Sequence, residues 1–165
     1  HFNSKCIIDI DLPETLILSI PFIVNLFPNA KILLPNEINE KISEDTLLNY
    51  DFIFLTPGQI KLLEDNLIDL FINTSSFAEM SMNQIREYIN LIQKAGKQDS
   101  LFFCSNRVEK NPNAETKDQN SKNIEPIKFL EYPFFNNEIL FFEICKLTNL
   151  VKYAPAYLRL EKIKK

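Results

Sequence analysis

Glycine and histidine are scarce in this chain of 165 residues, and both scarcities limit its chemistry. There are two glycines, Gly58 and Gly96, one histidine, His1, and no tryptophan. A histidine-based zinc site, a Ser-His-Asp or Cys-His triad and a multi-glycine phosphate loop all need residues that the sequence does not hold. These classes of site are therefore excluded for this chain, and no metal site is expected.

The charge balance and the cysteines limit the partners and the compartment. Eighteen Lys and Arg against 22 Asp and Glu give a net charge of −4, so neither nucleic acid nor an anionic membrane is expected as a partner. Cys6, Cys104 and Cys145 lie inside apolar runs and read as core residues in a reducing compartment. There is no apolar run of about 18 residues and no secretory leader pattern, so a cytoplasmic protein without a membrane helix is predicted.

Strand-like and helix-like patterns alternate along the first two thirds of the chain. Strands are predicted over 5–10, 31–34, 51–56, 67–74 and 100–105, and helices over 16–27 and 76–95, with a helical turn in 59–65. The strands are almost uniformly apolar, which is typical of a parallel sheet with helices on both faces. The strand over 67–74 is expected to be buried on both faces. The helix after it is expected to begin at a Ser76–Glu79 capping box and to stop at Gly96.

The last third of the chain has a different character. Residues 109–123 include no large apolar residue, so 108–124 is predicted to be a solvated loop or insertion. Segments around 140–144 and 157–163 could complete the sheet as antiparallel edge strands. With 45% hydrophobic residues, 1–165 is predicted to be one domain. A strand-like run begins within five residues of His1, which suggests that the chain starts inside a larger fold.

Polar residues follow each apolar run, where open parallel sheets bind their ligands. They are Asp11, Gln59, Asn73, Thr74, Ser75, Ser76, Asn106 and Arg107. An acid at a strand end can accept hydrogen bonds from ribose hydroxyls, but Asp11 and Glu14 also have the spacing of a helix cap, so both roles stay open. Glu79 is either a general base or the partner of Ser76 in the capping box. Asn73 interrupts a β-favouring run, which suggests a place at the edge of a cleft.

These residues, in this order, resemble the sugar O-methyltransferase family, a branch of the S-adenosylmethionine-dependent methyltransferases with a Rossmann-like sheet. The likeness covers roughly residues 5–107. It rests on Asp11-Leu-Pro-Glu-Thr-Leu16, Phe54-Leu-Thr-Pro-Gly-Gln59, Asp69-Leu-Phe-Ile-Asn-Thr-Ser-Ser-Phe-Ala-Glu-Met80 with Tyr88 downstream, and Phe103-Cys-Ser-Asn-Arg107. The resemblance implies S-adenosylmethionine as cofactor and a sugar hydroxyl, or another small molecule, as methyl acceptor.

The resemblance also implies a role for each candidate residue. Asp11 would bind the cofactor ribose, and Gln59 would lie near the adenine, where related enzymes often have an acid. Asn73 and Ser75 would complete the cofactor site. Ser76, Asn106 and Arg107 would contact the acceptor, with Glu79 as the base.

One departure from the family stands out. Such enzymes have a first strand and a glycine-rich turn before the segment that begins at Asp11, and only about ten residues precede Asp11 here. In the usual strand order, the missing strand is the central one, between the strands that end at Asp11 and Asn73. Three readings therefore stay open: a methyltransferase or the C-terminal part of one, a non-catalytic Rossmann-like remnant or interaction domain without cofactor, and another nucleotide-dependent enzyme such as a dehydrogenase. The sequence does not define the acceptor position or the oligomeric state.

Overall fold

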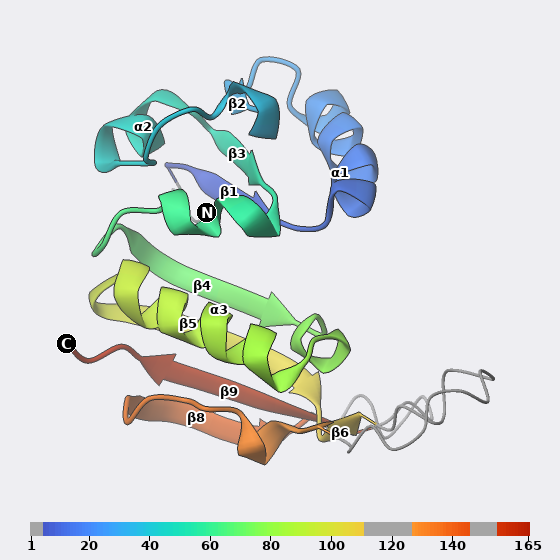
Figure 1. Cartoon of the computed structure of the whole chain (residues 1–165), viewed down its shortest axis with the longest axis vertical. Helices are drawn as coiled ribbons and strands as arrows, with labels where there is room; N and C mark the ends of the chain where they lie inside the picture. Colours follow the sequence, from blue (N-terminus) through green and yellow to red (C-terminus); the bar gives the residue numbers. More distant parts are fainter. Residues whose placement is uncertain (1–4, 111–126, 146–154) are drawn as a thin grey trace. The chain divides into compact units, whose positions relative to one another are not determined.

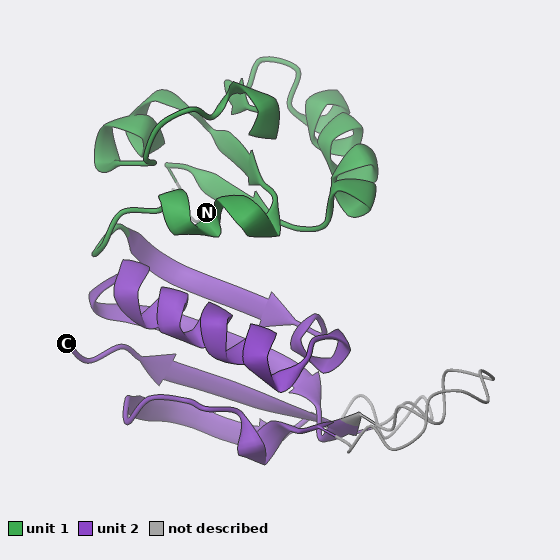
Figure 2. Ribbon diagram, viewed as in Figure 1, with its two compact units in different colours: residues 1–67 green, residues 68–165 purple. Residues whose placement is uncertain are grey.

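A computed structural model describes residues 5–110, 127–145 and 155–165 (Figure 1). Most of the predicted loop over 108–124 therefore lies outside the described residues. The chain forms two compact units, residues 1–67 and 68–165, and each is described by itself (Figure 2). The single domain over 1–165 stays a prediction. None of the described helices is long and apolar enough to cross a membrane.

The first unit is built on a small parallel sheet. Its elements are β1 (Ile7–Ile10), α1 (Pro13–Leu26), β2 (Ile32–Leu33), the 3-10 turn η1 (Pro35–Glu37), α2 (Glu44–Asn49), β3 (Phe52–Leu55) and the 3-10 turn η2 (Pro57–Leu62). The strand order is β1-β3-β2, and both pairs are parallel. The three predicted strands and the helix after the first of them are confirmed. Ile53, Phe54 and Leu55 are buried because β3 lies between the other two strands.

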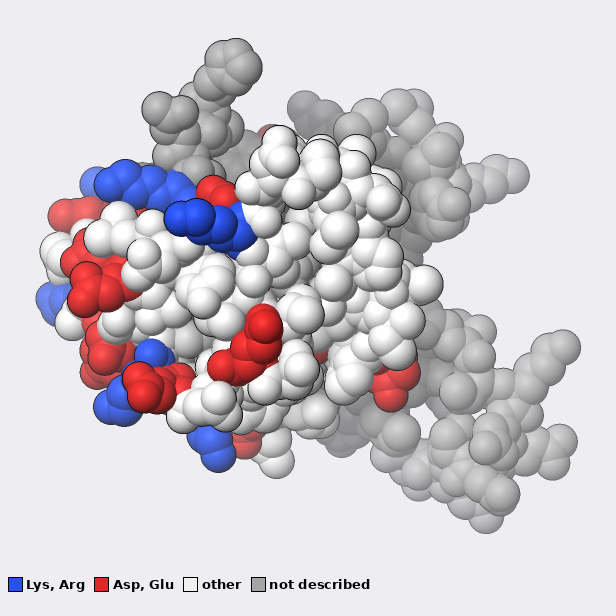
Figure 3. Space-filling view, turned by 90° about the horizontal axis from the view of Figure 1, so that it is seen from above, with Lys and Arg blue, Asp and Glu red and all other residues white. Residues whose placement is uncertain are grey.

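Helix α1 begins and ends where proline chemistry predicts. Pro13 occupies the first turn, where its missing N–H costs nothing, and the helix ends just before Pro28. Of its residues only Leu16 is buried, although the helix has apolar side chains on all sides. Figure 3 shows charged side chains gathered on the left of the view, while the right, where α1 lies in Figure 1, is nearly free of them.

The second unit is a mixed sheet with one long helix. Its elements are β4 (Ile68–Thr74), η3 (Phe77–Glu79), α3 (Met82–Ala95), β5 (Gly96–Arg107), β6 (Glu109–Lys110), β7 (Ile127–Lys128), η5 (Phe129–Glu131), β8 (Glu138–Ile144) and β9 (Ala156–Lys162). The order is β4-β5-β9-β8, with β4 parallel to β5 and the other pairs antiparallel. The parallel strands joined by a helix and the antiparallel C-terminal strands confirm the predicted α/β, Rossmann-like class. The short β6–β7 pair was not predicted.

The core of this unit lies between α3 and one face of the sheet. Its buried members are Phe77, Ile85, Ile89, Ile92, Phe102, Cys104, Phe129, Tyr132 and Ile163. The helical isoleucines are spaced three or four residues apart, which puts them on one stripe facing β5. Burial raises the pKa of the Cys104 thiol to about 12, so this cysteine is a core residue as predicted.

The predicted start of the second helix is wrong. Ser76 makes no side-chain cap, because it has helical backbone angles and its hydroxyl accepts a hydrogen bond from Asn73 instead. Glu79 closes a 3-10 turn. The capping box is formed five residues later, where the Ser81 hydroxyl accepts from the Gln84 amide and the Gln84 side chain accepts from the Ser81 amide.

Strand β4 is not buried on both faces, which corrects a second prediction. Leu70 is 44% exposed and Ile72 is 66% exposed. The reason is that the core with α3 covers one face of this sheet, where Phe71 packs, and Leu70 and Ile72 point to the other face. Strand β4 also forms one end of its sheet, as β1 forms one end of the other. The predicted missing strand would flank these same two strands, and it stays a prediction.

Candidate functional site

Asp11 lies directly beyond the carboxyl end of β1. Its amide donates to the Leu55 carbonyl at 3.2 Å, which continues the pairing with β3. One carboxylate oxygen, Oδ1, accepts from the Leu12 amide at 2.7 Å, and the second has no hydrogen-bond partner among the described residues. Leu12, not Asp11, is the N-cap residue of α1, and its side chain makes no capping hydrogen bond. Asp11 therefore does not adopt the cap role that its spacing with Glu14 suggested, and its ligand role stays a prediction.

The neighbouring acid, Asp9, serves the fold. Its Oδ2 accepts from the Ser19 hydroxyl at 3.2 Å, which ties β1 to α1. Burial raises the pKa of Asp9, the hydrogen bond from Ser19 partly offsets this rise, and the charge of Asp11 adds to it. The contact with Ser19 thus assigns Asp9 to the packing of β1 against α1.

Gln59 lies in η2, after β3, at the same carboxyl edge of the sheet as Asp11 because β1 and β3 are parallel. Its Oε1 accepts from the Thr56 amide and hydroxyl, both at 3.0 Å. Its Nε2 donates to the Pro35 carbonyl at 2.8 Å. The side-chain amide thus joins η2 to η1, and the second hydrogen of its Nε2 has no partner among the described residues.

Asn73, Ser76 and Asn106 form a hydrogen-bonded cluster at the carboxyl edge of the second sheet. Asn106, only 1% exposed, accepts from the Ala78 amide at 3.1 Å and donates to Asn73 Oδ1 at 2.8 Å. Asn73 Nδ2 donates to the Ser76 hydroxyl at 2.5 Å. The structure therefore brings three predicted site residues together, and their amide groups fix the loop after β4.

Ser75 shapes this loop through its backbone. Its φ of 65° lies in the left-handed region, which is unusual for serine, and its amide donates to the Ser105 carbonyl at 2.7 Å. The Ser75 side chain is exposed. Strained backbone of this kind is common where a loop must present groups to a ligand.

Glu79 ends η3 at the surface, and its amide donates to the Ser76 carbonyl at 3.0 Å. The charge of Glu79 acts on Tyr132, whose pKa is raised first by burial and then by Cys104 and Glu79. Tyr132 was not among the predicted site residues. It lies among the aromatic residues between Phe129 and Phe135, and in sequence this pattern indicates core packing and no site.

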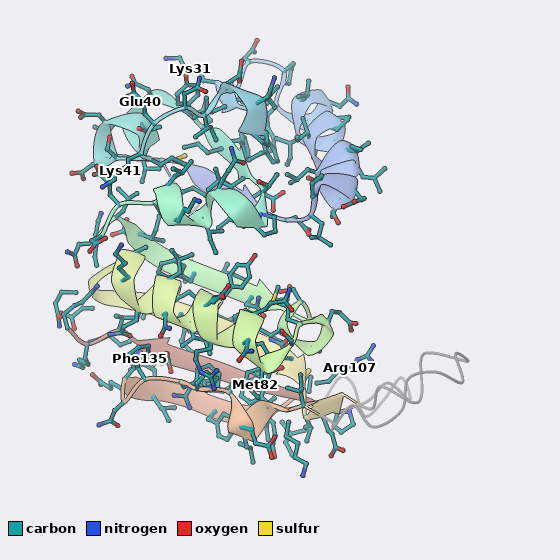
Figure 4. The ribbon with its side chains drawn as sticks, viewed as in Figure 1. Lys31, Glu40, Lys41, Met82, Arg107 and Phe135 are labelled. Carbon is teal, nitrogen blue, oxygen red and sulfur yellow. The ribbon has the colours of Figure 1, made fainter. Side chains whose placement is uncertain are left out.

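The two predicted acceptor residues at the end of β5 point in opposite directions. Consecutive strand residues face opposite sides of a sheet, so Asn106 points to the core while Arg107 is exposed. In Figure 4 the Arg107 side chain extends away from the sheet. The structure does not place these two side chains on one surface.

The predicted residues thus form two groups, each at the carboxyl edge of its own sheet. Asp11 and Gln59 belong to the first unit, and the residues from Asn73 to Arg107 belong to the second. In the described ranges, no three His, Cys, Asp or Glu gather in a way that could hold a metal ion. The first sheet has an acid, Asp11, that can accept hydrogen bonds at its carboxyl edge. The second sheet has a hydrogen-bonded polar loop after β4 at its carboxyl edge.

Comparison with known proteins gives a likeness in fold. No family model and no curated protein matches the sequence. An arsenic(III) S-adenosylmethionine methyltransferase from Chlamydomonas reinhardtii is similar in structure, with a TM-score of 0.53 and 14% identity, over 99% of this chain and 56% of that one. A SAM-dependent methyltransferase from Archaeoglobus fulgidus gives a TM-score of 0.41 at 15% identity, covering 90% of this chain and 93% of that one.

The first of these likenesses shows that the chain has the Rossmann-like α/β fold found in a methyltransferase. The chain spans 56% of the length of that structure, so it matches part of a larger protein.

Proposed function

We propose that this chain is a S-adenosylmethionine-dependent O-methyltransferase, or the C-terminal part of one, that acts on a sugar hydroxyl. The observation that carries the proposal is Asp11: an acid at the carboxyl end of a parallel strand, with one carboxylate oxygen left without a partner among the described residues. The fold likeness to a methyltransferase and the sequence resemblance to sugar O-methyltransferases support it. The sugar acceptor rests on the sequence resemblance alone.

The fit of the cofactor is partial. A carboxylate that accepts from two ribose hydroxyls suits Asp11, because charge-assisted bonds are about twice as strong as neutral ones. The methionine end of such a cofactor is usually bound by a glycine-rich turn, and neither Gly58 nor Gly96 has positive φ or precedes Asp11 in the chain. In this proposal Asp11 contacts the ribose, and no described residue is assigned to the methionine end.

Each candidate residue has a defined task in this proposal. The bound cofactor supplies a methyl group activated by its sulfonium charge. Asp11 holds the ribose, with Gln59 nearby, and Ser75 presents the loop after β4. The Glu79 carboxylate removes the proton from the acceptor hydroxyl, which makes the oxygen a better nucleophile.

Ser76 and Arg107 orient the acceptor at the surface, and Asn73 and Asn106 keep that loop rigid. Asn106 acts as a positioning residue, since its side chain is buried and hydrogen-bonded. This assignment refines its predicted role as an acceptor contact. Precise placement is what a displacement reaction at carbon needs most from the protein.

The experiment is a calorimetric titration of S-adenosylhomocysteine into the chain and into Asp11→Ala, with Glu14→Ala as matched control. Glu14 is an exposed acid in the first turn of α1. Hydrogen bonds to charged groups contribute about 1.5–3 kcal/mol, so Asp11→Ala is expected to weaken binding at least about tenfold. Equal binding by wild type and Asp11→Ala would count against the ribose role.

Methyl transfer is tested with labelled S-adenosylmethionine and a panel of saccharides. Glu79→Gln is expected to lower the transfer rate about 10²-fold or more without changing cofactor binding, as for loss of a general base. Glu87→Gln, an exposed acid on α3, is the control and is expected to keep the rate. Transfer that survives in Glu79→Gln would assign the base elsewhere.

A second function, a non-catalytic interaction domain, is favoured by one observation. The side-chain amides of Gln59, Asn73 and Asn106 are all engaged in hydrogen bonds within the fold. Absence of any heat with S-adenosylhomocysteine from a chain that is folded by circular dichroism would support this reading.

A further inference from the structure

Helix α1 exposes apolar side chains where a surface helix normally presents polar ones. Leu18, Phe22 and Leu26 are 74%, 62% and 55% exposed. The helix carries one charged residue, Glu14. Helix α3, by contrast, buries its isoleucines and turns charged side chains to water, as is usual. Among the described residues, the outer side of α1 is thus an apolar surface with few charges (Figure 3).

Three of the exposed side chains form one row along the helix. Leu18, Phe22 and Leu26 are four residues apart, and residues at this spacing lie one above the other on a helix. The row lies away from the core, because Phe22 is about 120° around the helix from the buried Leu16. It is also symmetric about Phe22, with a leucine four residues before it and another four residues after it.

We propose that α1 packs against α1 of a second copy of this chain, in antiparallel orientation, around a two-fold axis at Phe22. A two-fold interface brings the same surface of both copies together, so the surface must fit itself. With the axis at Phe22, Leu18 packs beside Leu26 of the second copy, and Leu26 beside Leu18. Rows of side chains four residues apart are the ridges of the commonest class of helix packing. This inference does not depend on methyl transfer.

The charges of the helix favour this orientation and this occupant. Glu14 precedes Phe22 by eight residues, about 12 Å, so the two Glu14 carboxylates of an antiparallel pair are about 24 Å apart, well beyond the Debye length of about 8 Å. A parallel pair in register would place them side by side. Helices that bind membrane surfaces carry Lys or Arg beside their apolar face, and α1 carries neither.

The area of the row suits a weak dimer. A large apolar side chain that is more than half exposed presents roughly 100 Å², so the row and the polar residues beside it bury about 500 Å² per copy. The total of about 1,000 Å² is at the low end of specific interfaces, and we expect a dimer Kd on the order of 10 µM.

Sedimentation velocity of the full chain, from about 1 to 300 µM, brackets this Kd and measures it. Phe22→Lys puts two charges at the two-fold axis and is expected to raise the Kd at least about 30-fold, as for the centre of an interface. Ile17→Lys is the matched control, because Ile17 is 70% exposed on the same helix but about 140° around it from Phe22. It is expected to leave the Kd unchanged. Circular dichroism checks that both variants keep the fold.

A charge pair tests the antiparallel orientation. In the double variant Leu18→Glu with Leu26→Lys, the new carboxylate of one copy lies beside the new ammonium group of the other. The double variant is therefore expected to dimerise more tightly than either single variant. The two groups are eight residues apart, so they do not meet within one helix. In a parallel pair like charges would meet, and the double variant would be no better than the single ones.

Three results would overturn the proposal. The first is a chain that stays monomeric up to about 300 µM, well above the expected Kd. The second is an equal rise of the Kd in Phe22→Lys and Ile17→Lys, or a double variant that gains nothing over the single ones. The third is a monomeric chain that binds vesicles of phosphatidylcholine and loses this binding in Phe22→Lys, which would assign the row to a membrane surface.

Discussion

Replacing Asn106 by alanine tests whether this residue supports the loop after β4. The side chain is 1% exposed and makes three hydrogen bonds that alanine cannot make, of which the one to Cys104 Sγ is a weak bond to sulfur and the other two carry the argument. One bond satisfies the amide of Ala78, which is itself buried. The other holds Asn73, which in turn holds Ser76. We expect Asn106→Ala to lower the free energy of unfolding with no ligand present.

The magnitude follows from these two bonds. Leaving the buried Ala78 N–H without a partner costs about 1–3 kcal/mol, and losing the bond to the half-buried Asn73 costs about 0.5–1.5 kcal/mol. Together they give about 2–4 kcal/mol, which is well within the stability of a typical domain. With a urea dependence of about 2 kcal/mol per molar, in the middle of the usual range, the unfolding midpoint falls by about 1–2 M.

The assay is urea unfolding followed by far-ultraviolet circular dichroism, because the chain has no tryptophan for fluorescence. The control is Asn90→Ala on the exposed side of α3, which is expected to raise stability by about 0.5 kcal/mol through helix propensity. A double-mutant cycle with Asn73→Ala is expected to give a coupling of about 1 kcal/mol. A loss below about 0.5 kcal/mol for Asn106→Ala would refute the reasoning.

Three further predictions concern buried contacts and one glycine. Gly96→Ala places a Cβ 2.7 Å from the nearest side-chain carbon and is expected to destabilise by about 1–3 kcal/mol in urea unfolding, whereas Gly58→Ala meets nothing within 4 Å and costs less than about 0.5 kcal/mol. Glu161→Ala leaves the partly buried Arg159 charge without its carboxylate and is expected to cost about 3 kcal/mol in the same assay, most of it recovered when both residues become methionine. Burial raises the folded-state pKa of Asp9 above its usual value of 3.8, so the folded state loses stability as pH rises from 3.8 to that raised pKa. In thermal unfolding, the stability of Asp9→Asn relative to wild type is therefore expected to increase between pH 3 and pH 7. A difference that stays constant over this range contradicts the prediction.

Local patterns were sufficient to predict most of the elements. The apolar runs that became β1, β3 and β4 are short, are bounded by proline or polar residues, and alternate with a helix, so the parallel arrangement follows from chain geometry. The start of α3 could not be predicted in this way, because Ser76–Glu79 and Ser81–Gln84 both have the spacing of a capping box. The bond from Asn73 to Ser76 decides between them, and it exists only once the strand and the loop have formed.

The candidate site was predictable to a lesser degree. Asp11 was found because a polar residue after an apolar run marks a strand end. The engaged side-chain amide of Gln59 could not be predicted, since its partner Pro35 lies 24 residues earlier in the chain. The exposure of Leu70 and Ile72 was missed for a related reason: an apolar strand has the same sequence pattern whether one or both faces of its sheet are covered.

The position of β9 between β5 and β8 has a consequence for biosynthesis. Strand β8 leaves the ribosome first, yet its only partner in the described sheet is β9, whose last residue lies 18 positions after Ile144 (162 − 144). At about 5–20 residues per second, β8 waits roughly 1–4 s with Leu140, Phe141 and Phe142 unpaired. During that interval chaperones can bind the unpaired strand. Slowing translation between residues 144 and 162 lengthens the interval and is expected to lower the yield of folded protein.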